Sequence, residues 1–276
     1  MKPPLITLLT DFGTSDPYVG IMKGILGGIS PESRLVDLTH HIPPGDIQRG
    51  AFALWQSSLD LPLGTIFLAV VDPGVGTERK AICLDCGGQR FIGPDNGLFS
   101  YLLHGKEYHA WELSNPAYQL STPGTTFHGR DIFAPAAAYA ANGISGDKFG
   151  NAVKSIQRLP EPRLELKGTS LSGEILSTDR FGNLFTSLGR FQSNDSWDLI
   201  LGSWIDQTKC KIKDRSYLEI LVKDKTLPLV KTFAAIPKGS CAGLIGSTGL
   251  LEITCNRGSA ENLLGLKRGD AVLLRW

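Results

Sequence analysis

The sequence has no marked excess of charge of either sign and no long apolar run. Its 276 residues include 28 Lys and Arg against 27 Asp and Glu, which gives a formal net charge of +1. This balance disfavours nucleic acid and anionic membranes as partners, because both are usually bound by a basic excess. Residues 66–71 form one of the longest apolar runs, far shorter than the roughly 20 residues of a membrane-spanning helix. We therefore expect a soluble chain with no signal peptide, whose partner is a small molecule or another protein chain.

Cysteine is scarce, and its number is odd. The five positions are Cys83, Cys86, Cys210, Cys241 and Cys255. An odd, scattered set argues against a disulfide framework and for a reducing compartment, so we expect a cytoplasmic location. Cys83 and Cys86 form a single C-x-x-C, which without a second Cys or His pair is a weak zinc signal. In a strand the two would point to opposite faces, and we expect both to pack in a core.

The first 160 residues alternate short apolar runs with helical patterns, as in a layered α/β fold. The apolar runs predict strands at 5–10, 35–38 and 65–71. Asp16 and Pro17 suit the start of one helix, Asp46 can cap a second that ends near residue 59, and the alanine-rich stretch 133–141 predicts a third. Residues 91–97 are rich in turn-forming types and predict a turn.

The pattern changes after residues 158–168, which contain two prolines and are typical of a linker. Beyond them, short apolar runs alternate with Gly, Asn, Asp and Pro at 173–176, 199–201, 218–222, 243–245, 250–254 and 271–274. This spacing predicts strands joined by turns. We therefore expect an α/β domain with a Rossmann-like layered sheet over residues 1–160, and an all-β domain, a small barrel or sandwich, over residues 161–276.

Two acidic residues follow predicted strands of the first domain. Asp11 comes after the run 5–10, and Asp72 comes after the run 65–71. Ligands of open α/β sheets bind outside the carboxyl ends of the strands, so both acids are candidates for a site. Pro73 and two glycines then bend the chain, which lets Arg79 return toward Asp72. A turn-capping role for Asp11 and a structural ion pair between Asp72 and Arg79 are the alternatives.

Other candidates lie in polar turns. Of the five histidines, only His128 is flanked by glycine and charge at a helix entrance, with Asp131 as the candidate cap. An imidazole there can face a cleft or lie on the surface. In the second half, residues 179–183 predict a turn whose Asn183 amide could bind a heterocycle edge, with Phe181 available to stack. A type I′ hairpin turn explains the same residues.

Several motifs taken together resemble the S-adenosyl-L-methionine hydroxide adenosyltransferase family, relatives of the fluorinase and chlorinase enzymes. They are TDFG at 10–13, VDPGVGTER at 71–79, GPDNG at 93–97, FHGRD at 127–131, DRFGN at 179–183, STG at 247–249 and NRGSA at 256–260. The similarity extends in order over nearly the whole chain, and VDPGVGT with its arginine and HGRD are its specific parts. It implies an enzyme that hydrolyses S-adenosyl-L-methionine to adenosine and L-methionine, without metal or other cofactor, as a homotrimer with sites between subunits.

The resemblance also assigns roles to residues. A water-activating trio falls on Asp72, Arg79 and His128, within the first domain. The implied substrate contacts are Asp11 to the ribose hydroxyls, Asp16 to the methionine part, Asp179 and Asn183 from a neighbouring subunit with Asn183 toward adenine, Ser247 to the methionine carboxylate, and Asn256 within the 255–257 backbone near adenine. Fluorinase-like relatives place a serine at Gly129 and a tyrosine at Asp72, so a halide pocket is disfavoured.

The expected mechanism follows from the sulfonium group. Methionine leaves as a neutral thioether, so attack on ribose C5′ requires a positioned oxygen nucleophile but no acid for the leaving group. We expect a water oriented by Asp72 and His128, which loses its proton as the C–O bond forms. The alternatives are a non-catalytic sensor of S-adenosylmethionine or adenosine, a chlorinase-like halide user, and a metal-dependent hydrolase with Asp11, Asp72 and His128 as ligands. Arg79 beside these acids disfavours a cation there.

Overall fold

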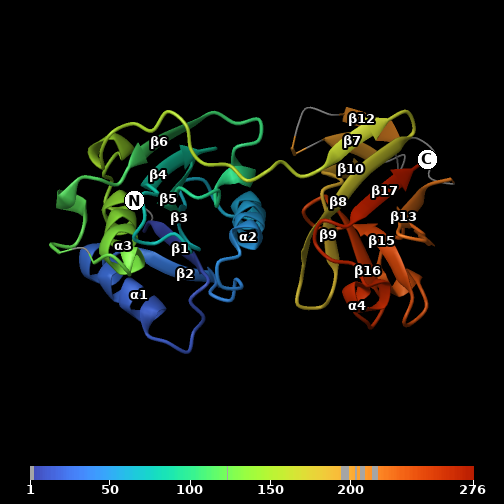
Figure 1. Cartoon of the computed structure of the whole chain (residues 1–276), viewed down its shortest axis with the longest axis horizontal. Helices are drawn as coiled ribbons and strands as arrows, with labels where there is room; N and C mark the ends of the chain where they lie inside the picture. Colours follow the sequence, from blue (N-terminus) through green and yellow to red (C-terminus); the bar gives the residue numbers. More distant parts are fainter. Residues whose placement is uncertain (1–2, 123, 194–198, 203, 206–208, 213–216) are drawn as a thin grey trace. The chain divides into compact units, whose positions relative to one another are not determined.

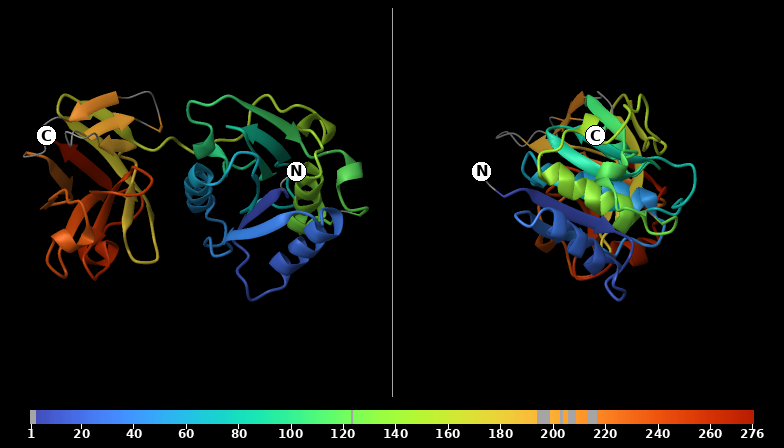
Figure 2. Two further views of the ribbon diagram at one scale, coloured as in Figure 1. Left: turned by 180° about the vertical axis from the view of Figure 1, so that it is seen from behind. Right: turned by 90° about the vertical axis from the view of Figure 1, so that its left-hand side faces the viewer.

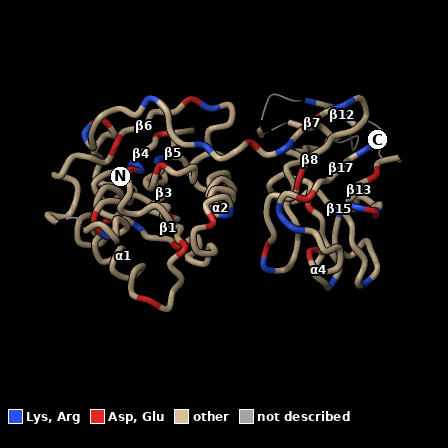
Figure 3. Tube along the Cα trace, viewed as in Figure 1, with Lys and Arg blue, Asp and Glu red and all other residues tan. Residues whose placement is uncertain are grey.

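The computed structural model describes residues 3–122, 124–193, 199–202, 204–205, 209–212 and 217–276. The chain divides into two compact units, Met1–Leu159 and Pro160–Trp276, whose helices and strands are labelled in Figure 1. Lys and Arg are interspersed with Asp and Glu along the trace of both units (Figure 3). Within the described ranges, no helix combines the length and apolarity that crossing a bilayer requires.

The first unit is built on a six-stranded sheet with the order β2-β1-β3-β5-β4-β6. Its strands are β1 (Leu5–Thr10), β2 (Arg34–Thr39), β3 (Ile66–Val70), β4 (Ala81–Cys86), β5 (Gln89–Pro94) and β6 (Tyr108–Glu112). The strands β2, β1, β3 and β5 run parallel, whereas β4 is antiparallel to both of its neighbours. The three predicted strands are confirmed, and so is the layered α/β class.

The prediction of a turn at 91–97 is wrong for its first half, because β5 lies inside the sheet. The chain reverses earlier, at Gly87 and Gly88, whose φ angles of 60° and 77° form the β4–β5 hairpin. Gly93 pairs with Ile82 of β4 within the strand, and a side chain there would overlap the carbonyl oxygen of Ala69 on β3. The glycine thus marks a close approach of two strands rather than a reversal.

Helices cover both faces of this sheet (Figures 1 and 2). One face carries α1 (Tyr18–Ile29) and α3 (Ala134–Ala141), which pack against each other, and α2 (Ile47–Asp60) covers the other. Met22 and Leu26 of α1 are fully buried in a core with the alanines of α3 and strand residues such as Leu8. Because alanine side chains are small, α3 can lie close to its neighbours, and the predicted alanine-rich helix is confirmed.

The helix starts agree with the sequence only in part. Asp46 caps α2 as predicted, and its carboxylate accepts a hydrogen bond from the Arg49 N–H at 3.0 Å. Asp16 does not cap α1, because the residue at the N-cap is Pro17. Asp131 is not a cap either. It lies inside a π-helical turn, Gly129–Phe133, that begins after His128 and precedes α3, so its carboxylate accepts instead from the Gly124 N–H at 2.8 Å.

The second unit is a nearly barrel-shaped antiparallel sheet. The strand order is β14-β13-β17-β8-β9-β16-β15, with β7 paired to β8, and β10-β11-β12 form a separate small sheet. The strands are β7 (Leu164–Lys167), β8 (Ser170–Thr178), β9 (Leu184–Thr186), β10 (Phe191–Ser193), β11 (Leu199–Gly202), β12 (Lys209–Ile212), β13 (Glu219–Val222), β14 (Lys225–Leu227), β15 (Cys241–Ile245), β16 (Leu251–Cys255) and β17 (Ala271–Arg275), and the short helix α4 (Ala260–Leu264) precedes β17.

Two features refine the predictions for this unit. A bridge from Leu229 to Gly243 brings the chain after β14 beside β15, which nearly closes the sheet. The all-β class with a small barrel is therefore confirmed. The predicted linker 158–168 is too long, because Leu164–Lys167 pairs with β8 as β7. Its prolines lie before that strand, where they remove no ladder hydrogen bond.

Candidate active site

The parallel strands β1 and β3 bring Asp11 and Asp72 to the same edge of the sheet. Thr10 pairs with Val70 at the ends of the two strands, so the acids follow neighbouring positions. The backbone N–H of Gly45 donates to Asp11 Oδ2 at 2.8 Å. Burial raises the pKa of Asp11, and the charge of Asp72 raises it further while the Gly45 bond lowers it. The negative charge of Asp72 therefore disfavours the ionised form of the Asp11 carboxyl.

Asp72 and Arg79 form a two-bond ion pair. Arg79 Nε donates to Asp72 Oδ1 at 3.0 Å, and a terminal nitrogen donates to Oδ2 at 2.6 Å. The side chains are 4% and 9% exposed, so this pair is largely withdrawn from water. Gly76, with φ of 80°, lies in the tight turn that returns the chain. A fork of this kind fixes both orientation and charge of the carboxylate.

Arg79 also holds His128, from a segment 49 residues further along the chain. Its terminal nitrogen lies 2.6 Å from His128 Nδ1. A guanidinium can only donate, so Nδ1 accepts and the ring proton of the neutral imidazole is on Nε2. Burial lowers the pKa of His128, and the charge of Arg79 lowers it further. The geometry thus keeps His128 neutral, with an N–H donor on the far side of the ring.

A cavity of about 250 Å³ opens beside this trio. Its lining consists of Phe12, Tyr18, Val70, Asp72, Val75, Thr126, Phe127, His128 and Gly129. The rings of Phe12, Tyr18 and Phe127 meet edge to face, with centroids 5.2–5.9 Å apart. Ring faces and a carboxylate favour a cationic ligand. The volume is below the roughly 300 Å³ minimum of a drug-sized site, so the cavity accommodates part of such a ligand.

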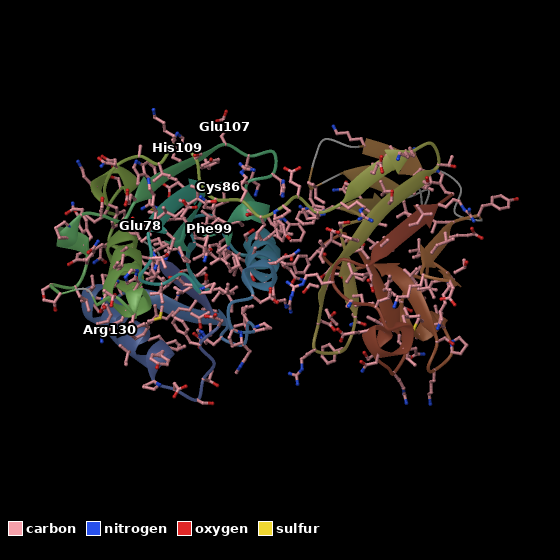
Figure 4. All side chains as sticks on the ribbon, viewed as in Figure 1. Glu78, Cys86, Phe99, Glu107, His109 and Arg130 are labelled. Atoms are coloured by element: carbon pink, nitrogen blue, oxygen red, sulfur yellow. The ribbon has the colours of Figure 1, made fainter. Side chains whose placement is uncertain are left out.

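The other predicted contacts of the first unit lie outside this lining. Asp11 lies next to Asp72 but does not line the cavity, and Asp16 is exposed before α1. Figure 4 shows His109 on the edge strand β6 and Glu107 just before that strand, both far from Arg130, the second residue after His128. Among the described residues, no three His, Cys, Asp or Glu side chains are grouped to hold a metal ion. Arg79 bonds both Asp72 and His128, where such an ion would have to lie.

The C-x-x-C pair belongs to the core of the first unit, as expected. Cys83 is fully buried in β4, and burial raises the pKa of its thiol to about 12. Cys86, 5% exposed, has its thiol 3.5 Å from the carbonyl oxygen of Leu102. Neither thiol has the lowered pKa that redox or metal chemistry requires.

In the second unit, Asp179 and Asn183 form a hydrogen-bonded turn between β8 and β9. Asp179 Oδ1 accepts from the backbone N–H groups of Phe181 and Asn183, at 2.8 and 2.9 Å. Asn183 Nδ2 donates to Asp179 Oδ2 at 2.9 Å, and its Oδ1 accepts from Thr254 at 2.7 Å. The type I′ interpretation is wrong, because Gly182 alone in this turn has a positive φ, 82°. Phe181 is 70% exposed, and the guanidinium carbon of Arg180 lies 5.8 Å from its ring centroid.

The late turns give mixed results. Ser247 is exposed between β15 and β16, in keeping with a contact residue. The Asn256 amide donates to the Ile236 carbonyl at 2.7 Å, so this side chain holds its own loop. Glu252, which the motifs did not point to, is 8% exposed in β16. Its signal in the sequence is a charged residue in the middle of the apolar run Leu251–Cys255.

Comparison with known proteins places these features in a family. The model of the SAM hydroxide adenosyltransferase N-terminal domain matches residues 6–150, and that of its C-terminal domain matches residues 173–273. A Thermus thermophilus protein named (R)-S-adenosyl-L-methionine hydrolase is 38% identical, covering 99% of this chain and 100% of its own. A fluorinase from an Actinoplanes species is 29% identical over 98% and 96% of the two chains. The crystal structure of an uncharacterized conserved protein from Thermotoga maritima matches with a TM-score of 0.85 and 30% identity, covering 98% of this chain and all of the other.

Proposed function

The chain belongs to the S-adenosyl-L-methionine hydroxide adenosyltransferase family, and on that premise we propose that it hydrolyses S-adenosyl-L-methionine to adenosine and L-methionine with a water held by Asp72, Arg79 and His128. The observation that carries the site is the connected trio, in which one guanidinium bonds both the carboxylate and the imidazole. The aromatic cavity beside it suits the sulfonium centre, which is a cation.

The hydrogen bonds of the trio define how it holds the water. His128 donates from Nε2 to the water oxygen, because its Nδ1 is engaged by Arg79. Asp72 accepts one water proton, since each of its oxygens keeps a lone pair beside its bond to Arg79. The remaining lone pair of the water is then free to attack ribose C5′ in line with the departing sulfur.

Asp72 is the proton acceptor in this arrangement. Ionising water in advance would cost roughly 16 kcal/mol, from a pKa of 15.7 against about 3.9 for an aspartate. Prior ionisation is unnecessary, because C–O bond formation first gives a protonated alcohol, which is far more acidic than water. That proton passes to Asp72, while the C–S bonding electrons leave with neutral methionine. Arg79 fixes the carboxylate and the tautomer of His128.

The remaining assignments extend the same proposal. Asp11 binds the ribose hydroxyls, which its place beside Asp72 supports. Asp16 and Ser247 contact the methionine part, and both are exposed. Asn183 and the loop of Asn256 hold the adenosine side, and Asp179 is a further substrate contact, supported by the ordered turn at 179–183.

The assembly follows the family resemblance. The unit with the trio supplies the water and the β-rich unit of a neighbouring subunit completes the site, in a cytoplasmic homotrimer that uses no metal or cofactor. The volume of the cavity beside the trio, too small for a whole nucleoside with its amino acid, supports a site completed by other residues.

Isotope labelling tests the reaction directly. Purified protein is incubated with S-adenosylmethionine in oxygen-18 water, with and without chloride and with and without a chelator. The molecular mass of the nucleoside product is then measured. We expect singly labelled adenosine in every case. Absence of adenosine, a chlorinated nucleoside, or loss of activity with the chelator would each contradict the proposal.

Two substitutions separate the roles of the imidazole. His128→Gln places an amide N–H near the position of Nε2, whereas His128→Asn reaches only the position of Nδ1. If His128 donates from Nε2, the Gln variant keeps part of the turnover while the Asn variant loses about 10²-fold or more. Equal loss of kcat in both variants would show that His128 takes the proton.

A further inference from the structure

Glu252 lies on the face of β16 that is turned away from the apolar core. Its strand neighbours Leu251 and Ile253 belong to the core of the second unit. Glu252 pairs with Phe185 of β9, which in turn pairs with Ser177 of β8. Directly opposed residues of antiparallel strands share a face. Ser177, Phe185 and Glu252 therefore form a row across three strands on the face opposite the core.

Two polar groups of this row have no partner among the residues that the structure describes. Glu252 is 8% exposed, and no hydrogen bond or ion pair joins its carboxylate to a residue in the described part of the chain. The hydroxyl of Ser177, in a residue 4% exposed, is also buried without a hydrogen bond to any described residue. Buried polar groups in native proteins are normally satisfied, so this face lacks a component that ligand binding would supply.

The surroundings of Glu252 indicate the charge of that component. Burial raises the pKa of Glu252 to about 7, and the charge of Asp179 raises it further. Asp179 accepts hydrogen bonds from two backbone N–H groups and from Asn183, but it forms no ion pair with a described residue. Two carboxylates that influence each other's charge, and that no described cationic side chain pairs with, are complementary to a positively charged group with several N–H donors.

The position of Glu252 indicates which end of the substrate it meets. Its carboxylate lies against Gly246, because a side chain on that glycine would overlap it. Ser247 is the next residue, at the turn assigned to the methionine carboxylate. In an amino acid the carboxylate and the ammonium group are bonded to the same carbon. If Ser247 binds the carboxylate of the methionine part, a side chain next to Ser247 is therefore close to the α-ammonium group.

We propose that Glu252 is a further substrate-binding residue, whose carboxylate receives, together with Asp179, the α-ammonium group of S-adenosylmethionine. This inference rests on the proposed function. It adds a requirement that hydrolysis alone does not impose, since the substrate must carry a cationic amino group as well as the sulfonium. Glu252 thus contributes to selection of the amino acid, while the trio of the first unit directs the water.

A substrate cycle tests the proposal. The kcat/KM of the wild type and of Glu252→Gln is measured with S-adenosylmethionine and with its analogue lacking the α-amino group. We expect the wild type to prefer the natural substrate by about ten-fold or more, and the variant to lose that preference by acting less well on the natural substrate alone. Glu219→Gln, at an exposed ion pair with Arg275, is the matched control and should leave both values unchanged.

The other outcomes are decisive. A drop in kcat/KM by the same factor for both substrates in Glu252→Gln would make Glu252 structural, and unchanged kcat/KM values for both substrates would remove it from the site. Either result overturns the proposal. If the wild type produces no adenosine, the proposed function fails. Calorimetric binding of the two sulfonium compounds to wild type and variant then still decides whether Glu252 binds the ammonium group.

Discussion

Removing the charge of Glu252 is expected to stabilise the protein at high pH. The fold raises the pKa of this carboxyl from 4.5 to about 7, so the folded state holds the proton more tightly than the unfolded chain. Ionisation therefore costs stability as the pH rises from about 4.5 to 7, and the cost is complete above 7. The full difference corresponds to an upper bound of about 3.4 kcal/mol. Because solvent and protein relaxation screen part of the charge, we expect Glu252→Gln to stabilise the protein by about 2 kcal/mol at pH 8.

Urea unfolding of wild type and Glu252→Gln at pH 5 and pH 8 measures this effect. The gain should be about 2 kcal/mol at pH 8 and under about 1 kcal/mol at pH 5, where the wild-type carboxyl is largely protonated in the folded state. Glu219→Gln, which changes an exposed carboxylate, should show no comparable gain at pH 8. An equal gain at both pH values would refute the reasoning, since it could not arise from ionisation of Glu252.

Three further outcomes can be checked. Arg79→Lys should lower kcat by about 10²-fold with little change in KM, because an ammonium cannot bridge Asp72 and His128 as a fork, and an unaltered kcat would contradict the role of the bridge. Gly129→Ser should lower the free energy of unfolding by about 1–3 kcal/mol, because a Cβ there comes within 2.9 Å of the Phe127 ring. It should not confer chlorination. Thermal melts measure the first effect and product masses the second. Cys83 should resist iodoacetamide in the native protein and react after denaturation, as read by intact mass, and native labelling would contradict its burial.

Local sequence was sufficient to predict the half of the candidate site that lies in one turn. The apolar run before Asp72 predicts a buried strand, and the proline and glycines after it predict the return of Arg79. Both follow from steric preferences of neighbouring residues, and the ion pair at 2.6 Å agrees with them. The contact of Arg79 with His128 could be placed only through the family resemblance, because 49 residues separate the two.

Features that depend on pairing between distant segments were missed. Gly93 looks like a turn residue in the sequence, yet it lies in a strand, where a glycine is needed because β3 passes too close for a side chain. Asp131 is of a residue type that often caps helices, but the helical turn begins two residues earlier, at Gly129. Glu252 is conspicuous only once the register of β8, β9 and β16 places it in one row with Ser177, whose hydroxyl has no partner among the described residues.

The carboxylate of Asp179 fixes which way round the Asn183 amide lies. Since a carboxylate only accepts, the amide nitrogen must face it, which leaves the oxygen for the hydroxyl of Thr254. The second N–H of the Asn183 amide nitrogen and the second lone pair of its oxygen therefore have a fixed direction in the protein without ligand. In the proposed contact, adenine offers a ring nitrogen as acceptor to the N–H and its amino group as donor to the lone pair. Hypoxanthine has a carbonyl in place of that amino group. Because the amide cannot rotate to suit it, S-inosylmethionine should persist in a mixture from which the adenosyl compound is consumed.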